Sequence, residues 1–117
     1  MSLLFILNDA PYGSENVYNA LRLATKLQQE HADAEIRIFL MADAVTSTLT
    51  NQTTPQGYYN VERMLKALII KGAQVKICGT CAEGRGIHNL GLLPGAEIST
   101  MSQLAQWVMD TDKVLTF

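Results

Sequence analysis

The chain has 117 residues, of which 48% are apolar and 17% charged, and its formal net charge is −2. This size and composition predict one globular domain over residues 1–117 with a single core, and they exclude an intrinsically disordered chain. A charge this close to neutral, without any basic run, gives no electrostatic basis for binding nucleic acid or an anionic membrane.

The first residues, MSLLFILND, are apolar but carry no leading Lys or Arg. The apolar run stops at Asn8, which is too short for a signal peptide or a membrane span. We therefore expect a cytoplasmic protein. A reducing compartment disfavours a permanent disulfide, so Cys78 and Cys81, spaced as C-x-x-C, indicate redox or metal chemistry.

The first part of the chain predicts a strand, a helix and a second strand. Residues 3–7 form a continuous apolar run, typical of a strand covered on both faces. The segment NDAPYGS follows, in which Ser14 is a good N-cap and Glu15 favours a first helical turn. Apolar residues then recur at helical spacing: Val17, Ala20, Leu21, Ala24 and Leu27. Residues 35–41 (EIRIFLM) predict the second strand.

The middle of the chain predicts a long loop, a helix and a third strand. Residues 42–57 lack a clear period and are expected to form the longest loop. Asn60 is expected to cap a helix that ends at Gly72. Its apolar stripe follows the spacing i, i+3, i+4, i+7, i+8: Val61, Met64, Leu65, Leu68 and Ile69. Residues 74–78 predict the third strand.

The last part predicts a short fourth strand at residues 96–99, a helix, and a fifth strand at residues 113–117. Thr100 and Gln103 have the spacing of a capping box. The expected buried stripe of this helix is Met101, Leu104, Ala105, Val108 and Met109. Three large side chains fall beside or off the helix stripes and are expected between subunits: Tyr18, Leu23 and Trp107.

Strands that alternate with helices predict right-handed crossovers and a parallel sheet with helices on both faces. The functional site of such a sheet lies at the carboxyl ends of its strands. NDAPYGS, ADAV and CGTC follow the first three strands, so these segments are expected to meet at one edge. Cys78 is expected there, where a starting helix and Arg85 would both favour a thiolate.

Four interpretations of KICGTCAEGRG remain open. The two cysteines are a thioredoxin-like dithiol, or they join His88 in a metal site, which would lack a fourth ligand within one chain. They are buried small side chains, as free cysteines often are. Alternatively, one activated cysteine is a sulfur carrier, which attacks a sulfur donor, holds a persulfide and needs neither a second cysteine nor a cofactor.

Four segments in this order resemble the DsrE/DsrF-like family of small sulfur-relay proteins, and within it the YchN-like branch: APYGS, FLMADAV, VKICGTCAEGRG and LAQWVMDTDKVLTF. The resemblance covers essentially the whole chain. It implies a three-layer α/β/α fold with a five-stranded parallel sheet. It also implies homo-oligomers or mixed oligomers, commonly hexamers.

The resemblance implies that Cys78, after the third strand, carries a persulfide, followed at the family's spacing by Arg85 and Gly86. Cys81 matches only the YchN-like branch. Two turns of the carboxyl edge also match the family, and they supply four further candidate binding residues: Tyr12, Gly13, Ser14 and Asp43. Ser14 is also explained as a plain N-cap, Tyr12 as packing, and Asp43 as a turn residue or as the partner of Arg85.

The sequence thus favours sulfur handling, with Cys78 as a nucleophile that exchanges sulfur with donor and acceptor proteins, as a sulfur transferase or carrier without a cofactor or metal ion. Arg85 and loop N–H groups are expected to stabilise its thiolate. Two alternatives stay open. One is a regulatory oligomer that binds a small ligand or partner without covalent chemistry, and the other is a thiol redox switch between Cys78 and Cys81.

Overall fold

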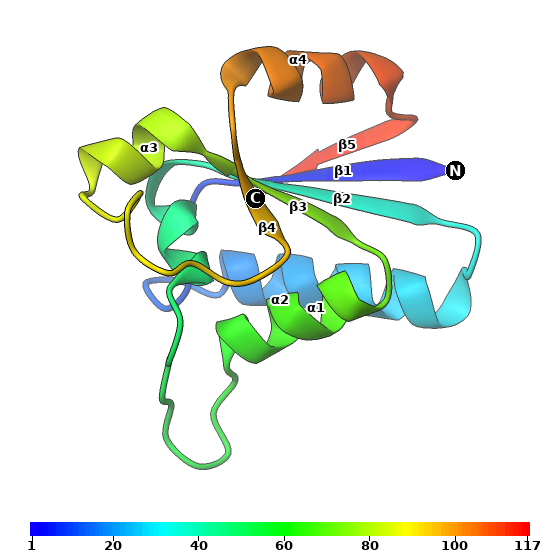
Figure 1. Ribbon diagram of the computed structural model, residues 1–117. Coiled ribbons are helices and arrows are strands. Elements are labelled where there is room, and N and C mark those ends of the chain that lie inside the picture. The colour runs from blue at the N-terminus through cyan, green and yellow to red at the C-terminus, as the bar shows by residue number, and fades with distance from the viewer.

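The computed structural model describes residues 1–117 as a parallel sheet with helices packed against both faces (Figure 1). The elements are, in chain order, β1 (Ser2–Leu7), α1 (Asn16–Glu30), β2 (Glu35–Leu40), the 3₁₀ helix η1 (Ala42–Thr48), α2 (Val61–Ile70), β3 (Gln74–Cys78), α3 (Gly79–Gly84), β4 (Ala96–Ser99), α4 (Met101–Asp110) and β5 (Lys113–Thr116). All five predicted strands and the three longer predicted helices are present.

The sheet has the order β4-β3-β2-β1-β5, and every neighbouring pair is parallel. Helices α1 and α2 cover one face, and α4 crosses the other face to carry the chain from β4 at one edge to β5 at the opposite edge (Figure 1). The predicted three-layer α/β/α fold with a five-stranded parallel sheet is therefore confirmed. None of the helices is long and apolar enough to cross a membrane.

The larger core lies between the sheet and helices α1 and α2. It follows from the predicted patterns, because alternate residues of β1 and β2, such as Phe5 and Ile38, meet the buried stripes of the helices, such as Leu21 and Leu65. The start of α2 is also as predicted, since the Asn60 side chain accepts a hydrogen bond of 3.0 Å from the backbone N–H of Arg63.

The predicted N-cap of α1 is wrong by one residue. The helix begins at Asn16, and Glu15 occupies the N-cap position without a side-chain capping bond. Ser14 still accepts a hydrogen bond of 3.3 Å from the Asn16 N–H, but its hydroxyl donates to the carboxylate of Asp9 at 2.9 Å. The hydrogen bond to Asp9 therefore holds the Ser14 side chain in the preceding turn, one residue before the N-cap position.

The predicted loop over residues 42–57 is not irregular throughout. It opens with η1, in which Ala44 and Val45 are buried and the Thr46 hydroxyl donates to the Asp43 carbonyl at 2.7 Å. Such local bonds close single turns without a sustained apolar period, which is why the sequence pattern did not predict them. Only the remainder of the segment is an extended loop.

The last helix, α4, forms where predicted but buries a different face. Thr100 caps it by accepting from the Gln103 N–H at 3.2 Å. Its buried residues are Leu104 and Trp107, whereas Met109 is 83% exposed. Met101 and Val108 of the predicted stripe are exposed as well.

Trp107 explains why α4 buries a different face from the predicted one. Its ring meets the Phe39 ring edge-on, at a centroid distance of 6.3 Å, and the cationic groups of Arg37 and Lys76 lie 5.8 and 5.2 Å from its centroid. Burying one indole removes more apolar area from water than burying a Met or Val, and cations add to its stabilisation. Trp107 is therefore buried within the chain, and the expectation that it lies between subunits is wrong.

Candidate functional site

The cysteine pair lies at the carboxyl edge of the sheet, where β3 passes directly into α3. Cys78 is the last residue of β3 and the N-cap of α3, and its sulfur accepts from the Cys81 N–H at 3.4 Å. A Cβ atom at Gly79 would stand 3.0 Å from the Ser99 carbonyl oxygen, so glycine allows this sharp turn beside β4. The turn places the two cysteines next to each other at the carboxyl edge of the sheet.

Hydrogen bonds favour a thiolate at Cys78. Burial raises the pKa of Cys78, but donors on Cys81 and Thr80, from both side chain and backbone, outweigh burial and hold the pKa below its ordinary value. The Thr80 hydroxyl lies 3.4 Å from the Cys78 sulfur. A thiolate is the nucleophilic form of cysteine, so Cys78 is the more activated sulfur of the pair.

The pKa of Cys81 is shifted in the opposite direction. Burial and its hydrogen bond to Cys78 raise the pKa of Cys81, although the Ala42 N–H donates to its sulfur at 3.2 Å. Ala42 adopts the left-handed region with φ of 50°, uncommon for a residue with a side chain, and this conformation accompanies the contact. Cys81 is therefore the less acidic thiol of the pair.

Arg85 contacts Asp43 rather than the Cys78 sulfur. Its Nε and Nη2 atoms both lie 2.8 Å from Oδ1 of Asp43, and Nη1 donates to the Cys81 carbonyl at 3.1 Å. Asp43 belongs to η1, so the guanidinium ties η1 to α3 across the cysteine pair. The predicted pairing of Asp43 with Arg85 is present, while the expected stabilisation of the Cys78 thiolate comes from Thr80 and Cys81.

Gly86 completes this arrangement because it adopts φ of 68° directly after Arg85. The turn that it allows brings the Ile87 N–H back to the Ala82 carbonyl at 3.0 Å and ends α3. Cys78 beneath α3 is only 5% exposed and packs in the smaller core with Val45 and Ala82. The sulfur is thus activated but covered.

The turn after β1 lies at the same edge but bonds to a different segment. Tyr12 donates to the Gln52 side chain and accepts from the Val61 N–H at 3.0 Å, and its ring stacks on Tyr59. Gly13 and Ser14 likewise bond or pack within their own turn. Tyr12 therefore anchors the loop before α2, and none of these three candidates hydrogen-bonds to either cysteine.

All four tyrosines of the chain join this contact region. Tyr18 stacks on Tyr59 with ring centroids 4.0 Å apart, and Tyr58 also stacks on Tyr59, with ring centroids 4.4 Å apart. The hydrogen bond with Tyr58, together with burial, raises the pKa of Tyr59 to about 12. The stack holds the extended loop against the start of α1.

Two participants in the cysteine site were not predicted, namely Thr80 and Ala42. A hydroxyl two residues after a helix-capping cysteine is a signal that could have identified Thr80. Ala42 had no such signal, because its contact depends on the fold of η1. His88 is exposed, and no three His, Cys, Asp or Glu side chains are grouped as metal ligands.

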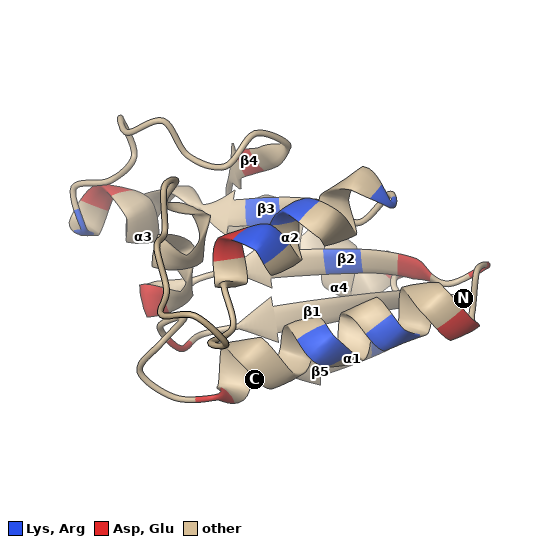
Figure 2. Cartoon of the chain, turned by 90° about the horizontal axis from the view of Figure 1, so that it is seen from below, with Lys and Arg blue, Asp and Glu red and all other residues tan.

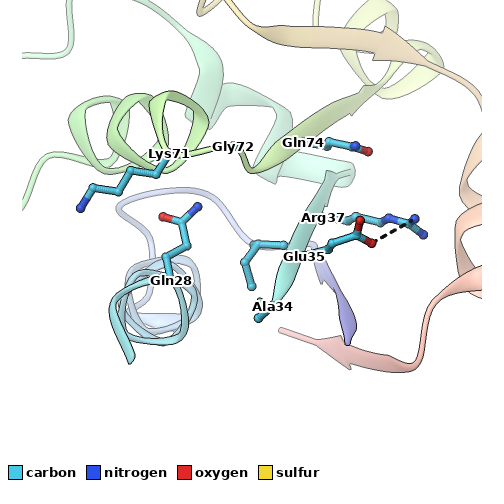
Figure 3. A pocket seen from close by; sticks show the side chains of 8 residues that line it. Gln28, Ala34, Glu35, Arg37, Lys71, Gly72 and Gln74 are labelled. Atoms are coloured by element: carbon cyan, nitrogen blue, oxygen red, sulfur yellow. Dashed lines mark ion pairs between the residues drawn. The ribbon is translucent and has the colours of Figure 1, made fainter. Parts of the chain in front are cut away.

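A polar cavity of about 140 Å³ lies at the opposite, amino edge of the sheet (Figure 3). Gln28 of α1 and Lys71 after α2 stand on one side of it, and the ion-paired Glu35 and Arg37 of β2 on the other. It is separated from the cysteines by the length of β3. The cavity therefore contributes no residue to the cysteine site.

The structure defines a small parallel α/β domain that carries a pair of cysteines at the carboxyl edge of its sheet. Residues 1–117 match the DsrE/DsrF-like family, and the chain belongs to that family. Protein YchN of Escherichia coli strain K12 is 47% identical over 115 residues, which cover 98% of this chain and 97% of YchN.

A solved structure and a further relative extend this result. The crystal structure of the Escherichia coli ychN protein matches with a TM-score of 0.96 at 46% identity, covering 100% of this chain and 99% of that chain. The uncharacterized protein MJ0989 of Methanocaldococcus jannaschii is 38% identical over 117 residues, which cover 100% of both chains.

Proposed function

We propose that this protein handles sulfane sulfur, with Cys78 as the cysteine that carries the persulfide. The observation that carries the proposal is the unequal cysteine pair: the Cys78 sulfur accepts a hydrogen bond from the Cys81 N–H, and hydrogen bonds lower the pKa of Cys78, whereas the pKa of Cys81 is raised. Membership of the DsrE/DsrF-like family supports the proposal, because Cys78 is the residue at which the resemblance to the sulfur-relay members implies a persulfide.

Loading is a displacement at the outer sulfur of a donor persulfide, R–S–SH. The Cys78 thiolate attacks that sulfur, a bond from Sγ to the outer sulfur forms, and the S–S bond of the donor breaks. The donor leaves as the thiolate R–S⁻, so charge and electrons balance without a cofactor. An acceptor thiolate then attacks the outer sulfur of the Cys78 persulfide and regenerates the Cys78 thiolate.

Cys81 has a supporting role in this scheme. Its thiol and its N–H stabilise the negative charge on Cys78 before attack and again after transfer. It does not itself hold the transferred sulfur. Replacing Cys81 should therefore slow loading without abolishing it.

Donor and acceptor proteins must gain access to a sulfur that is covered in the single chain. The ion pair between Arg85 and Asp43 is exposed and ties the two covering segments together, so its release would open the site. We infer that docking partners act here, in a reducing cytoplasm where both cysteines stay free.

We further infer a homo-oligomer of the hexameric type that the family resemblance implies. The support in this chain is the exposed apolar face of α4, to which Met101, Val108 and Met109 belong. Light scattering on the purified protein measures the assembly, and Met109→Glu should reduce it to smaller species. A monomer at all concentrations would contradict the inference.

The test of the sulfur-carrying function is mass analysis after treatment with an excess of a low-molecular-weight persulfide. The proposal predicts one added sulfur atom, located on the peptide that contains Cys78. Cys78→Ser should lose the adduct, whereas Cys81→Ser should retain it. An adduct that survives Cys78→Ser, or that is absent from the unaltered protein, would contradict the proposal.

A redox switch between Cys78 and Cys81 is the second candidate, favoured by the hydrogen bond of 3.4 Å that the Cys81 N–H donates to the Cys78 sulfur, which keeps the two cysteines close together. The oxidant would be a low-molecular-weight disulfide, R–S–S–R. Cys78 attacks it and releases one R–S⁻, and Cys81 displaces the second to form the internal disulfide. Cys81→Ser separates the candidates, because it abolishes this disulfide but leaves sulfur loading on Cys78.

A further inference from the structure

A groove of about 430 Å³ runs between the outer surfaces of α1 and α2. Its lining comes from one stripe of α1 at the spacing i, i+3, i+4, i+7 and from the facing turn of α2: Arg22, Thr25, Lys26, Gln29, Arg63, Met64 and Ala67. The floor is formed by half-buried or small side chains such as Met64, and three cationic side chains rise around it.

The three cations of this groove have no carboxylate partner. The ion pairs of the chain involve only Arg37, Lys76 and Arg85. Arg22 donates to the neutral side chain of Asn19, at 3.1 Å, and lies over the ring of Tyr18. Neither Lys26 nor Arg63 donates a side-chain hydrogen bond to any group of the chain.

The negative charges of this layer lie outside the groove. Figure 2 shows basic segments along both helices and acidic segments near helix ends. Glu62 at the start of α2 already accepts from the backbone N–H groups of Asn51 and Gln52. The chain as a whole has a net charge of −2, whereas the groove has an apolar floor bordered by three cations without ion-pair partners. The local charge of the groove is therefore positive, opposite to that of the whole chain.

We propose that the groove between α1 and α2 is a docking surface for an acidic segment of a partner protein. Arg22 and Lys26 stand one helical turn apart on α1, and Arg63 faces them from α2. A helical segment with carboxylates one turn apart could pair these carboxylates with the cations. Small apolar side chains between the carboxylates would then contact the apolar floor. The groove lies on the sheet face opposite Cys78, so this proposal is independent of the sulfur chemistry.

The experiment uses a synthetic amphipathic helical peptide with glutamates one turn apart and alanine and leucine between them. Binding is followed by backbone amide shifts of the full chain in nuclear magnetic resonance. The expected shifts cluster on residues 22–29 and 63–67. Neutralising the groove with Arg22→Gln, Lys26→Gln and Arg63→Gln together should weaken binding by about tenfold. Salt of about 0.5 M should likewise weaken the binding of the peptide to the unaltered protein, because it screens the same charges.

Lys66→Gln is the matched control, because Lys66 is an exposed cation on the same helix that does not line the groove. It should change affinity by less than about twofold. The peptide with glutamine in place of every glutamate should not bind. All substituted residues are exposed, and thermal unfolding verifies that the variants keep the fold.

Four results of the peptide-binding experiment would overturn the proposal. They are absence of binding, shifts that cluster outside the groove, equal losses in the groove variant and Lys66→Gln, and inorganic phosphate producing the same shifts and displacing the peptide. Loss of self-association in the groove variant would instead identify the occupant as a second copy of this chain, which also contradicts it.

Discussion

The two faces of the sheet differ in how they are covered. The face under α1 and α2 has 17 buried apolar residues, whereas the face under α3 and α4 has nine, among them Cys78. On the first face, two long helices pack over the strands by apolar contact. On the second, a six-residue helix covers the Cys78 sulfur, and polar contacts of Arg85 and Cys81 hold that helix to η1.

Because of this difference, the two faces should affect two separate properties: the free energy of unfolding and the access of reactants to Cys78. Large apolar contacts are cooperative and open only with the whole domain, while a short element held by exposed polar bonds opens locally at lower free energy. The α1 and α2 face therefore sets the stability of the fold. The α3 side sets how often Cys78 meets a reactant, and substitutions on the two faces should have different consequences.

Leu65→Ala tests the stable face and has the largest expected effect. Leu65 is fully buried in the larger core, so the cavity should lower the free energy of unfolding by about 3 kcal/mol, measured by denaturant titration. Alkylation of Cys78 under native conditions should keep its rate, because local opening of α3 does not involve Leu65. A faster alkylation would contradict the separation of the two faces.

Gly86→Ala tests the turn that ends α3. Its φ of 68° is unfavourable for a residue with a Cβ atom, so the free energy of unfolding should fall by about 1 kcal/mol. Alkylation of Cys78 should become faster because α3 is loosened. Gly91→Ala is the control, since it meets no neighbour within 4 Å and lacks a positive φ, and it should leave both measurements unchanged.

Asp43→Asn tests the contact between η1 and α3. The ion pair with Arg85 is largely exposed, so its loss should change global stability by less than about 1 kcal/mol. The rate of Cys78 alkylation should nevertheless rise by up to about fivefold, because local opening becomes easier. An unchanged rate would show that Arg85 and Asp43 do not control access to the sulfur.

Thr80→Val tests the thiolate itself and should alter stability least. Thr80 stabilises the charged form of Cys78, so its removal raises the pKa of Cys78 towards the ordinary value. The pH profile of Cys78 alkylation should therefore move to higher pH, and the rate near neutral pH should fall. Thr80→Ser keeps the hydroxyl and should retain the original profile.

Much of the fold could be predicted because its signals are strong and local. The apolar runs of β1 and β2 and the cap at Asn60 each act within a few residues. The buried face of α4 could not be predicted in the same way. Trp107 gains its place from Phe39 and from two cations on neighbouring strands, and these contacts exist only after the sheet has formed.

The site shows the same division. The position of Cys78 at the carboxyl edge followed from the order of strands and helices, and the pairing of Asp43 with Arg85 was expected among other interpretations. The contact of Ala42 with Cys81 depends on η1, whose turns have no apolar period. The sequence could therefore locate the cysteines without identifying which groups set their charge.

The most direct test of the central claim is a pH titration of the two cysteines by the ¹³Cβ chemical shifts of cysteine-labelled protein. Because the two sites are coupled, their titration steps belong to the pair, and the site-specific shifts show where the first proton leaves. The structure predicts that Cys78 loses its proton at lower pH than Cys81. Deprotonation of Cys81 first, or of both thiols together at their ordinary pKa, would contradict Cys78 as the activated nucleophile.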